Sequence, residues 1–426
     1  MEAIAASKLD PGFMSEVISK FRTDKQPTDL YNCLTCGMCS AGCPYNGVHD
    51  HADPRKFIRQ VLLGMKEEVL SSTFIWACTM CGRCTFQCPM NVDIAGLVRT
   101  IRSPKNFGLK APGFLQDVVD AQIRTGNQME VTREDYLETL EWMEEELQQE
   151  VGDPNARIPV DKEGAEFVFM WDPREIKYYP QDVQNIAKIM WAVGADWTVS
   201  SRWWDATHYA LFNGDDEDST TMVKRTMEEF ERLKVKAVVI TECGHAFRAQ
   251  SWGRKVWLNG ATYPVISFVQ LQAKWIKEGR IKLDPTRNPD RVTFHDPCNL
   301  VRKEGVVEEP RYCLQQAVMD FKEMWPNRQY NYCCGGGGGL LAMGKEIYPY
   351  RMAKGKLKAE QIKATGAKIV VSPCHNCYDQ LNDIIKYYKL DCKVNHIHHL
   401  VGNAMILPGK EEREALAGRS VLEGFI

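Results

Sequence analysis

The chain has 426 residues, of which 44% are hydrophobic, so it can bury a large core and we expect two or three domains. Its formal net charge of −3 excludes a general attraction to nucleic acid or anionic lipid, and no apolar stretch approaches the ~18 residues that a membrane-spanning helix needs. The sixteen cysteines and the absence of secretory regions in Met1–Lys20 predict a cytoplasmic protein whose thiolates hold metal.

Two runs of cysteine near the N-terminus share the spacing C-x2-C-x2-C-x3-C-P, which is typical of a pair of 4Fe–4S cubanes. In this pattern the fourth cysteine of each run ligates the other cluster. A structural zinc site closes with four ligands and does not explain such a duplicate. The spacing therefore predicts two cubanes, one on Cys33, Cys36, Cys39 and Cys88 and the other on Cys78, Cys81, Cys84 and Cys43.

Helical patterns surround these motifs. Apolar residues at helical spacing occupy the segment between the two runs, from Phe57 to Leu70, and the segment after Pro89, from Ile94 to Ile101. We expect an α-helical ferredoxin domain over residues 1–104. Linker helices follow over residues 105–160, where an apolar stripe runs from Leu137 to Leu147.

Beyond Pro159 the pattern changes to short β-branched strands that alternate with helices, which predicts α/β layers with parallel sheets. The expected strands are Glu166–Met170, Lys236–Thr241, Arg291–Phe294 and Lys368–Ser372. Phe169–Arg174 resembles Thr293–Cys298, and Lys236–Phe247 resembles Lys368–Tyr378, so we infer an internal duplication. The first copy spans residues 161–285, the second spans residues 286–405, and residues 406–426 form a C-terminal tail.

Five of the seven cysteines in the second copy form one set, which is one more than a cubane uses. This excess suggests a larger or more open iron–sulfur assembly, and Gly335–Gly339 would let the backbone pass close to inorganic sulfide. The five cysteines are Cys298, Cys333, Cys334, Cys374 and Cys377.

The first copy has lost four of the five equivalent positions, so we expect it to bind no cluster by itself and to wall the site of the other copy. Trp203 and Trp204 would supply bulk at this wall. Arginines would supply charge, namely Arg174, Arg202 and Arg248. Cys243 is the surviving cysteine, and it is either an inert core thiol, an extra ligand or a thiol that meets substrate sulfur.

At these residues the chain resembles a known family. The five-cysteine pattern resembles the CCG domain of heterodisulfide reductases, and its fusion to a ferredoxin resembles the fused catalytic subunit of the membrane-bound form. The segment Glu242–Ala246 is similar to that of DsrK-like subunits of sulfate reducers. The resemblance implies one noncubane 4Fe–4S cluster on the five cysteines of the second copy, which is then an intact CCG half beside a degenerate one.

The resemblance also implies a function in dissimilatory sulfur metabolism. Electrons would come from a quinol through a membrane cytochrome b subunit and other subunits of a respiratory complex, which would hold the chain at the inner face of the cytoplasmic membrane. The substrate would be a heterodisulfide, or a disulfide or trisulfide on a DsrC-like carrier protein. Such an enzyme is a thiol/disulfide oxidoreductase, in which His295 and Asp296 could deliver a proton, unless His295 is a satisfied strand-end histidine.

Two other interpretations belong to different classes. The chain could be an electron-relay subunit of a flavin-dependent dehydrogenase of the glycolate or glycerol-3-phosphate type, or a scaffold with structural clusters. The five-cysteine set speaks against the scaffold, because a scaffold has no need of an open cluster.

Some features favour a structural interpretation. The basic run Arg351–Lys368 is typical of a solvated helix, with docking of an acidic partner as the alternative. His396, His398 and His399 are weak evidence for a metal, because no carboxylate or cysteine spacing accompanies them. Cys313 and Cys392 are isolated, and we expect them to be structural.

Overall fold

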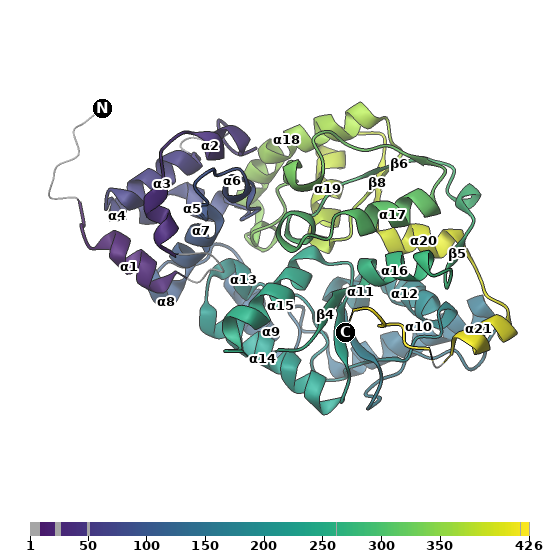
Figure 1. Cartoon of the computed structure of the whole chain (residues 1–426). Coiled ribbons are helices and arrows are strands. Elements are labelled where there is room, and N and C mark those ends of the chain that lie inside the picture. The colour runs from purple at the N-terminus through teal and green to yellow at the C-terminus, as the bar shows by residue number, and fades with distance from the viewer. Residues whose placement is uncertain (1–8, 22–26, 49–51, 261, 418, 426) are drawn as a thin grey trace.

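The computed structural model describes residues 9–21, 27–48, 52–260, 262–417 and 419–425. A helical N-terminal part is followed by two parts that each contain a parallel sheet (Figure 1). Residues 1–8, 22–26 and 49–51 of the expected ferredoxin domain lie outside the described residues. Among the residues that are described, no helix combines the length and the apolar character that a membrane crossing requires.

The N-terminal part consists of short helices around the cysteine runs, as the apolar spacing predicts. Asp53 caps α3 by accepting hydrogen bonds from the amides of Arg55 and Lys56, and Gly64, with a φ of 71°, separates α3 from α4. The helices are α1 (Phe13–Lys20), α2 (Met38–Gly42), α3 (Pro54–Leu62), α4 (Lys66–Leu70), α5 (Thr73–Ala77), α6 (Arg83–Phe86), α7 (Ile94–Arg102) and α8 (Pro104–Phe107).

Two helices, α9 (Leu115–Thr125) and α10 (Arg133–Val151), connect this part to the first sheet. Thr132 caps α10 by accepting a hydrogen bond from the Asp135 amide. The buried side of α10 carries Tyr136, Leu140, Met143 and Leu147. This face packs along α12 (Pro180–Ala192), so α10 is a layer of the first α/β part.

The first sheet has four parallel strands in the order β2-β1-β3-β4. All four residues of β1 and of β3 are buried, which explains their continuous apolar character. The strands are β1 (Phe167–Met170), β2 (Trp197–Val199), β3 (Ala237–Ile240) and β4 (Val265–Ser267). The other helices of this part are α11 (Pro173–Lys177), α13 (Ala210–Asn213), α14 (Asp216–Arg232), α15 (Gly244–Trp257) and α16 (Phe268–Lys277).

The second sheet repeats this arrangement in the order β7-β6-β8-β9, again with all strands parallel. Its strands are β6 (Arg291–Phe294), β7 (Asp320–Phe321), β8 (Ile369–Val371) and β9 (Lys393–Asn395). Its helices are α17 (Glu308–Ala317), α18 (Tyr348–Thr365), α19 (His375–Tyr388) and α20 (Ile397–Ala404). The last helix, α21 (Lys410–Leu416), returns to the first α/β part, where Arg413 pairs with Asp153 and lies over Trp191. A short antiparallel pair joins β5 (Lys282–Leu283) to β10 (Met405–Ile406).

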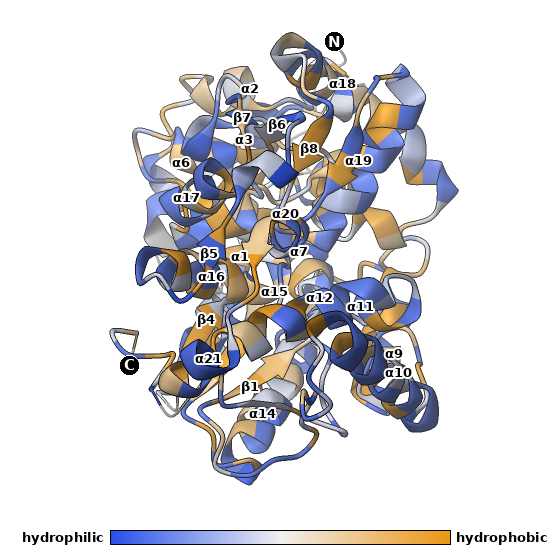
Figure 2. Ribbon diagram, turned by 90° about the vertical axis from the view of Figure 1, so that its right-hand side faces the viewer, coloured by the Kyte–Doolittle hydropathy of each residue, from blue (hydrophilic) through white to orange (hydrophobic). Residues whose placement is uncertain are grey.

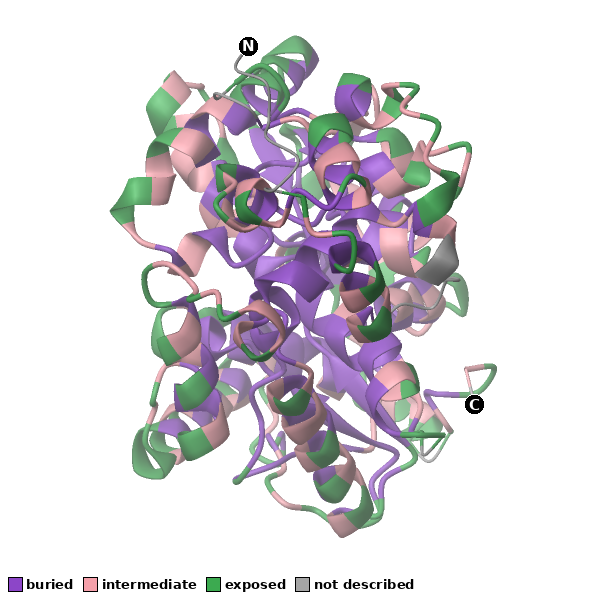
Figure 3. Ribbon diagram, turned by 90° about the vertical axis from the view of Figure 1, so that its left-hand side faces the viewer, coloured by how far each residue is buried: buried purple, intermediate pink, exposed green. Residues whose placement is uncertain are grey.

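The helices and parallel sheets confirm the predicted multidomain α/β class. The shared strand order agrees with an internal duplication, which stays an inference. The central strands β1 and β8 are hydrophobic while helices such as α10 and α21 carry hydrophilic stretches (Figure 2), and buried residues concentrate in the middle of the molecule (Figure 3).

The loops that leave the central strands of the two sheets meet each other. Cys243 follows β3 and Cys374 follows β8, and an isolated antiparallel bridge joins these two residues. Parallel strands bring their following loops to one edge of a sheet, so this meeting places the cysteine-bearing loops between the two sheets. The candidate site lies there.

Candidate iron–sulfur centres

Each cysteine run of the N-terminal part folds over a small cavity. One cavity is lined by Cys33, Cys36, Cys39 and Cys88, and the other is lined by Cys43, Cys78, Cys81 and Cys84. The crossing of the fourth cysteine follows the pattern that the spacing predicts. The residues fit two cubanes, because four thiols surround each cavity and none of the sixteen cysteines forms a disulfide.

The two runs share a local backbone conformation. Thr35 and Met80 have positive φ values of 57° and 48°, and Gly37 and Gly82 have values of 87° and 74°. These alternating left-handed residues turn the chain so that α2 and α6 start within each run. The tight loops that the spacing requires are therefore present.

A third group of thiols lies between the two sheets. The five cysteines of the predicted set and Cys243 are all buried. The Sγ atoms of Cys334 and Cys377 are 3.7 Å apart, Cys298 contacts Cys333, and Cys374 contacts both Cys377 and Cys243. The structure thus brings the predicted set together and adds Cys243 at its edge.

The thiols of this group differ in acidity. A hydrogen bond from Cys298 is the main cause that lowers the pKa of Cys333 to about 6, and hydrogen bonds from Cys333 and Cys377 lower the pKa of Cys334. Burial raises the pKa of Cys243. Contacts with neighbouring thiols also lower the pKa of Cys374, whereas they raise those of Cys298 and Cys377. The fit to an iron–sulfur group therefore rests on the gathering of five buried thiols.

The second and third groups touch each other. Cys81 contacts Cys333, and the hydroxyl of Thr79 lies 3.4 Å from the Sγ atom of Cys333. The guanidinium of Arg302 donates to the carbonyl of Cys81 and to that of Asn331, over 2.9 and 2.6 Å. The second N-terminal set of cysteines is therefore in contact with the five-cysteine group.

The glycine run makes a close approach, but to protein. A Cβ atom at Gly338 would lie 2.7 Å from the carbonyl oxygen of Cys78, and one at Gly336 would lie 2.6 Å from the Cβ atom of Gln380. The run therefore fits between the second cysteine run and α19. The first amide of the run, that of Gly335, donates to the Sγ atom of Cys333 over 3.4 Å, and close passage to inorganic sulfide stays a prediction.

Helix α18 supplies cations to the site, which corrects the expectation of a solvated basic helix. Arg351, Lys354 and Lys358 are buried on the face that points inward. Their spacing of three and four residues places them on one helix face. This periodicity is the feature of the sequence that indicates their burial. Lys356 and Lys363 are exposed on the other side, so the expectation of a solvated helix holds only there.

Lys354 reaches the boundary between the thiol groups, where its Nζ donates to the Thr79 hydroxyl over 2.6 Å. Burial opposes its charge, but the neighbouring sulfurs, with Cys333 foremost, raise its pKa. Burial lowers the pKa of Lys358 to about 8. A buried cation beside thiolates offsets their charge, and it makes a cluster on them easier to reduce.

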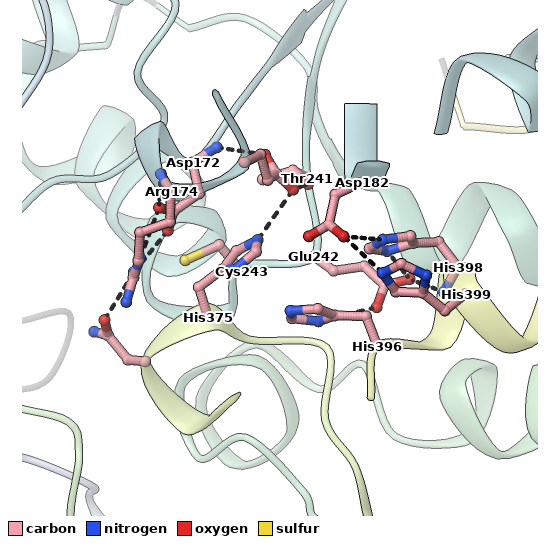
Figure 4. Close-up of polar contacts among 12 residues, drawn as sticks. Asp172, Arg174, Asp182, Thr241, Glu242, Cys243, His375, His396, His398 and His399 are labelled. Atoms are coloured by element: carbon pink, nitrogen blue, oxygen red, sulfur yellow. Dashed lines mark hydrogen bonds and ion pairs between the residues drawn. The ribbon is translucent and has the colours of Figure 1, made fainter. Parts of the chain in front are cut away.

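The first sheet part contributes Arg174 to the wall of the site. Its guanidinium pairs with Asp172 and with Asp379 of α19, both over 2.7 Å, and donates to Asn376 over 3.0 Å (Figure 4). The hydroxyl of Tyr209 also donates to Asn376, over 2.9 Å. These contacts hold the start of α19 between Cys374 and Cys377.

Other expected wall residues lie elsewhere. Trp204 stacks on Tyr136 of α10, with ring centroids 4.4 Å apart, and Trp203 donates to Thr226 of α14. Arg202 is exposed and Arg248 lies over Trp252, beside a surface hollow. These four side chains pack in or outside the first sheet part, and of the expected arginines Arg174 alone takes the predicted place.

Cys243 contacts His245, which the sequence did not identify as a candidate site residue. The Sγ atom of Cys243 lies 3.1 Å from the Nδ1 atom of His245, and these two side chains form a compact group with Cys374. The segment Glu242–Ala246 therefore places two side chains, those of Cys243 and His245, at the edge of the site. This placement is compatible with an extra ligand and with a thiol that meets substrate.

His295 and Asp296 separate in the structure. The ring of His295 lies with the sulfurs of Cys334 and Cys377, and burial lowers its pKa to about 3. Asp296 pairs with the buried Arg311 over 2.8 Å and accepts from the Arg328 amide. His295 is thus at the site as a neutral ring, whereas Asp296 is held in a structural ion pair.

Two regions of the chain match models of known domain families. Residues 32–93 match the model of the 4Fe–4S dicluster domain, and residues 292–382 match that of the cysteine-rich domain. These matches support 4Fe–4S clusters in this chain.

Several named relatives are iron–sulfur subunits or heterodisulfide reductase subunits. The chain is 24% identical to Hdr-like menaquinol oxidoreductase iron–sulfur subunit 2 of Archaeoglobus fulgidus, over 94% of this chain and 83% of that protein. It is 30% identical to the corresponding iron–sulfur subunit of Archaeoglobus profundus over 46% of this chain. It is 31% identical to a subunit of the dihydromethanophenazine:CoB–CoM heterodisulfide reductase of Methanosarcina barkeri over 45% of this chain. These last two matches span less than half of those relatives, 42% and 46% respectively.

Proposed function

We propose that this chain, which joins a 4Fe–4S dicluster domain to a cysteine-rich domain, is a heterodisulfide reductase-like protein and the catalytic iron–sulfur subunit of a membrane-associated complex. It accepts electrons that a cytochrome b partner takes from a quinol, and it reduces a disulfide or trisulfide. Relatives named as subunits of a menaquinol oxidoreductase and of a dihydromethanophenazine-dependent reductase support the quinol-like donor.

We assign three cluster sites. Two cubanes are held by the two four-cysteine sets that line the N-terminal cavities. The noncubane cluster is held by Cys298, Cys333, Cys334, Cys374 and Cys377 in the intact second half, which faces a degenerate first half produced by duplication. When bound, these groups supply one-electron transfer between the partner and the substrate sulfur.

The contact between Cys81 and Cys333 carries this proposal. It makes the second cubane set and the five-cysteine set neighbours, so an electron crosses no intervening domain. The buried Lys354 spans the same boundary and balances negative charge there. Two clusters with separate structural roles would need neither the contact between Cys81 and Cys333 nor the buried Lys354.

The remaining residues position groups and exclude water. Arg174 and Tyr209 fix Asn376 and so hold the start of α19, which carries Cys374 and Cys377. Disulfide reduction consumes two electrons and two protons and yields two thiols. His295, beside Cys334 and Cys377, is the side chain that we place against a leaving thiolate, where its neutral ring donates a hydrogen bond while the two protons come from solvent.

The substrate assignment is the finer part of the proposal. A heterodisulfide or a DsrC-like carrier protein with a disulfide or trisulfide fits a site where Cys243 lies at the edge of the sulfur group. The complex would function in dissimilatory sulfur metabolism, with the chain attached to the inner face of the membrane through its partners.

Electron paramagnetic resonance of the anaerobically purified protein tests this function. We expect an oxidised-cluster signal that changes when candidate thiols are added and that disappears in Cys334→Ser. Cys392→Ser is the matched control, since this half-buried cysteine lies outside all three groups and should keep every signal.

Reduced-cubane signals alone, indifferent to thiols and to Cys334→Ser, would contradict the catalytic proposal. They would favour an electron-relay subunit of a flavin-dependent dehydrogenase. Copurification with a flavoprotein rather than with a b-type cytochrome would lead to the same conclusion.

A further inference from the structure

A cluster of carboxylates and imidazoles lies beyond His375, on the side away from Arg174 (Figure 4). Its carboxylates come from the first sheet part, where Asp182 lies on α12 and Glu242 follows β3. Its imidazoles are His396, His398 and His399, at the start of α20 in the second sheet part. The cluster therefore forms only when the two parts meet.

The cluster is shielded from solvent on most sides. His398 and Glu242 have no exposed surface, and His396 and Asp182 are 2% and 4% exposed. The Oδ1 atom of Asp182 lies 2.6 Å from the Nε2 atom of His399 and 3.7 Å from that of His398. The side chain of His399 is 32% exposed, so an ion can reach the cluster from the surface.

The hydrogen bonds of this cluster leave imidazole nitrogens without partners. Within the part of the chain that the structure describes, neither ring nitrogen of His396 or of His398 has a hydrogen-bond partner. Three of these four nitrogens lie 3.5–3.7 Å from a carboxylate oxygen, too far for a good hydrogen bond. A buried polar group without a hydrogen bond costs about 1–3 kcal/mol, so these nitrogens call for an explanation.

Glu242 has a separate role. Its carboxylate accepts from the backbone amides of Ile397 and His398, both over 2.8 Å, and from the side-chain amide of Gln272 over 2.7 Å. The two backbone bonds satisfy the free amides at the start of α20. Glu242 thus orients the histidines, and its oxygens also lie 3.5 Å from the Nδ1 atom of His398 and 3.7 Å from that of His396. Asp182 faces the opposite ring nitrogens, the Nε2 atoms of His398 and His399.

We propose that Asp182, His398 and His399 bind a divalent transition metal, with His396 as the fourth ligand. The ligand atoms of Asp182, His398 and His399 all lie within 4.8 Å of one another. The same holds for the ligand atoms of Asp182, His375 and His396. Tetrahedral zinc with bonds of about 2.1 Å separates its ligand atoms by roughly 3.4 Å, which lies between the two separations measured from Asp182.

The donor set indicates the class of metal. Imidazole with one carboxylate suits zinc, and also iron(II) or cobalt(II), whereas calcium and magnesium prefer oxygen ligands alone. The metal would join α12 to α20 and so tie the two sheet parts together. This site uses no cysteine and is independent of the proposed iron–sulfur function.

A protonated His398 between Asp182 and Glu242 is the competing arrangement. It would balance charge and needs no metal, but it leaves the Nε2 atom of the buried His396 without a partner and its Nδ1 atom 3.7 Å from Glu242, beyond hydrogen-bond distance. The two arrangements differ in metal content, which can be measured directly.

The test uses the full chain with its clusters, purified anaerobically and analysed for zinc and iron by mass spectrometry. We expect about one zinc per chain after incubation with zinc chloride and removal of loose metal. The X-ray absorption spectrum at the zinc edge should show nitrogen and oxygen neighbours and no sulfur at about 2.3 Å. In H398Q/H399Q the zinc content should fall at least tenfold at unchanged iron content.

His208→Gln is the matched control, because His208 is buried outside this cluster and contacts the Ser219 carbonyl. It should keep its zinc. Sulfur neighbours would place the zinc on cysteines and overturn the site, as would absence of zinc from the native chain or equal zinc in H398Q/H399Q. Should that variant fail to fold, cobalt(II) absorption bands of the native chain report nitrogen and oxygen or sulfur ligation without any substitution.

Discussion

At the scale of single residues, the sulfur ligands and the charges around them obey different rules. The cysteines are recognised by spacing, because each cluster is wrapped by a short loop. Lys354 is recognised only by what surrounds it, since its Nζ contacts Thr79 at the junction of two thiol groups. Its charge therefore acts on the clusters through space, not through a ligand bond.

Lys354→Met should make the adjacent clusters harder to reduce. Loss of one buried positive charge near thiolates should lower their reduction potential, on the order of tens of millivolts. A redox titration followed by electron paramagnetic resonance measures this shift. Lys356→Met, on the exposed face of the same helix, should leave the potentials unchanged. Equal potentials in a cluster-loaded Lys354→Met protein would show that the charge has no such role.

At the scale of elements, the glycine run is a packing device between two segments that are far apart in the sequence. Gly338 has a φ of 67° and lies against the backbone of Cys78 and Thr79, while Gly336 lies against α19. The loop that holds Cys333 and Cys334 therefore depends on the position of the second cysteine run. Its geometry belongs to the assembled molecule.

Gly338→Ala should destabilise the protein by more than about 2 kcal/mol, because the new Cβ meets the Cys78 carbonyl in addition to left-handed strain. Gly152→Ala is the control, since Gly152 is also left-handed with a φ of 64° but a Cβ there meets no atom within 4 Å. It should cost only about 1 kcal/mol. Thermal unfolding monitored together with iron content compares the two, and equal shifts would argue against the clash.

At the scale of the whole molecule, one arginine joins the helical part to both sheet parts. The buried Arg102 of α7 donates to carbonyls of Ile75, Phe212 and Gly338, over 2.8, 3.0 and 2.7 Å, and also reaches those of Trp76 and Cys78. Burial lowers its pKa to about 10, so it remains charged at neutral pH. The relative position of the cubane sites and the five-cysteine site depends on this side chain.

Arg102→Met should cost about 3–5 kcal/mol, because it leaves several buried carbonyls without donors. Hydrogen exchange should increase around residues 75–78 and 336–340, and the melting temperature should fall. Arg124→Met, at an exposed ion pair with Glu130, should change stability by no more than about 0.5 kcal/mol. Unchanged exchange in both segments would mean that other contacts hold the parts together.

The sequence by itself determined the features that arise from local chain geometry. Cysteine spacing predicted which thiols line each N-terminal cavity, and β-branched runs located β1, β3, β6 and β8. The three-residue strands β2, β4 and β9 and the two-residue β7 were missed, because such short segments show no period of their own.

Only the tertiary structure decided which distant residues meet. It turned the basic face of α18 inward, placed Trp203 and Trp204 against α14 and α10, and brought Asp182 to three histidines that the sequence leaves without a carboxylate. The spacing of residues along the sequence does not predict these contacts, because they depend on how the two sheet parts pack against each other at their loop edges. The iron–sulfur motifs could therefore be predicted, whereas their electrostatic surroundings and the proposed metal site could not.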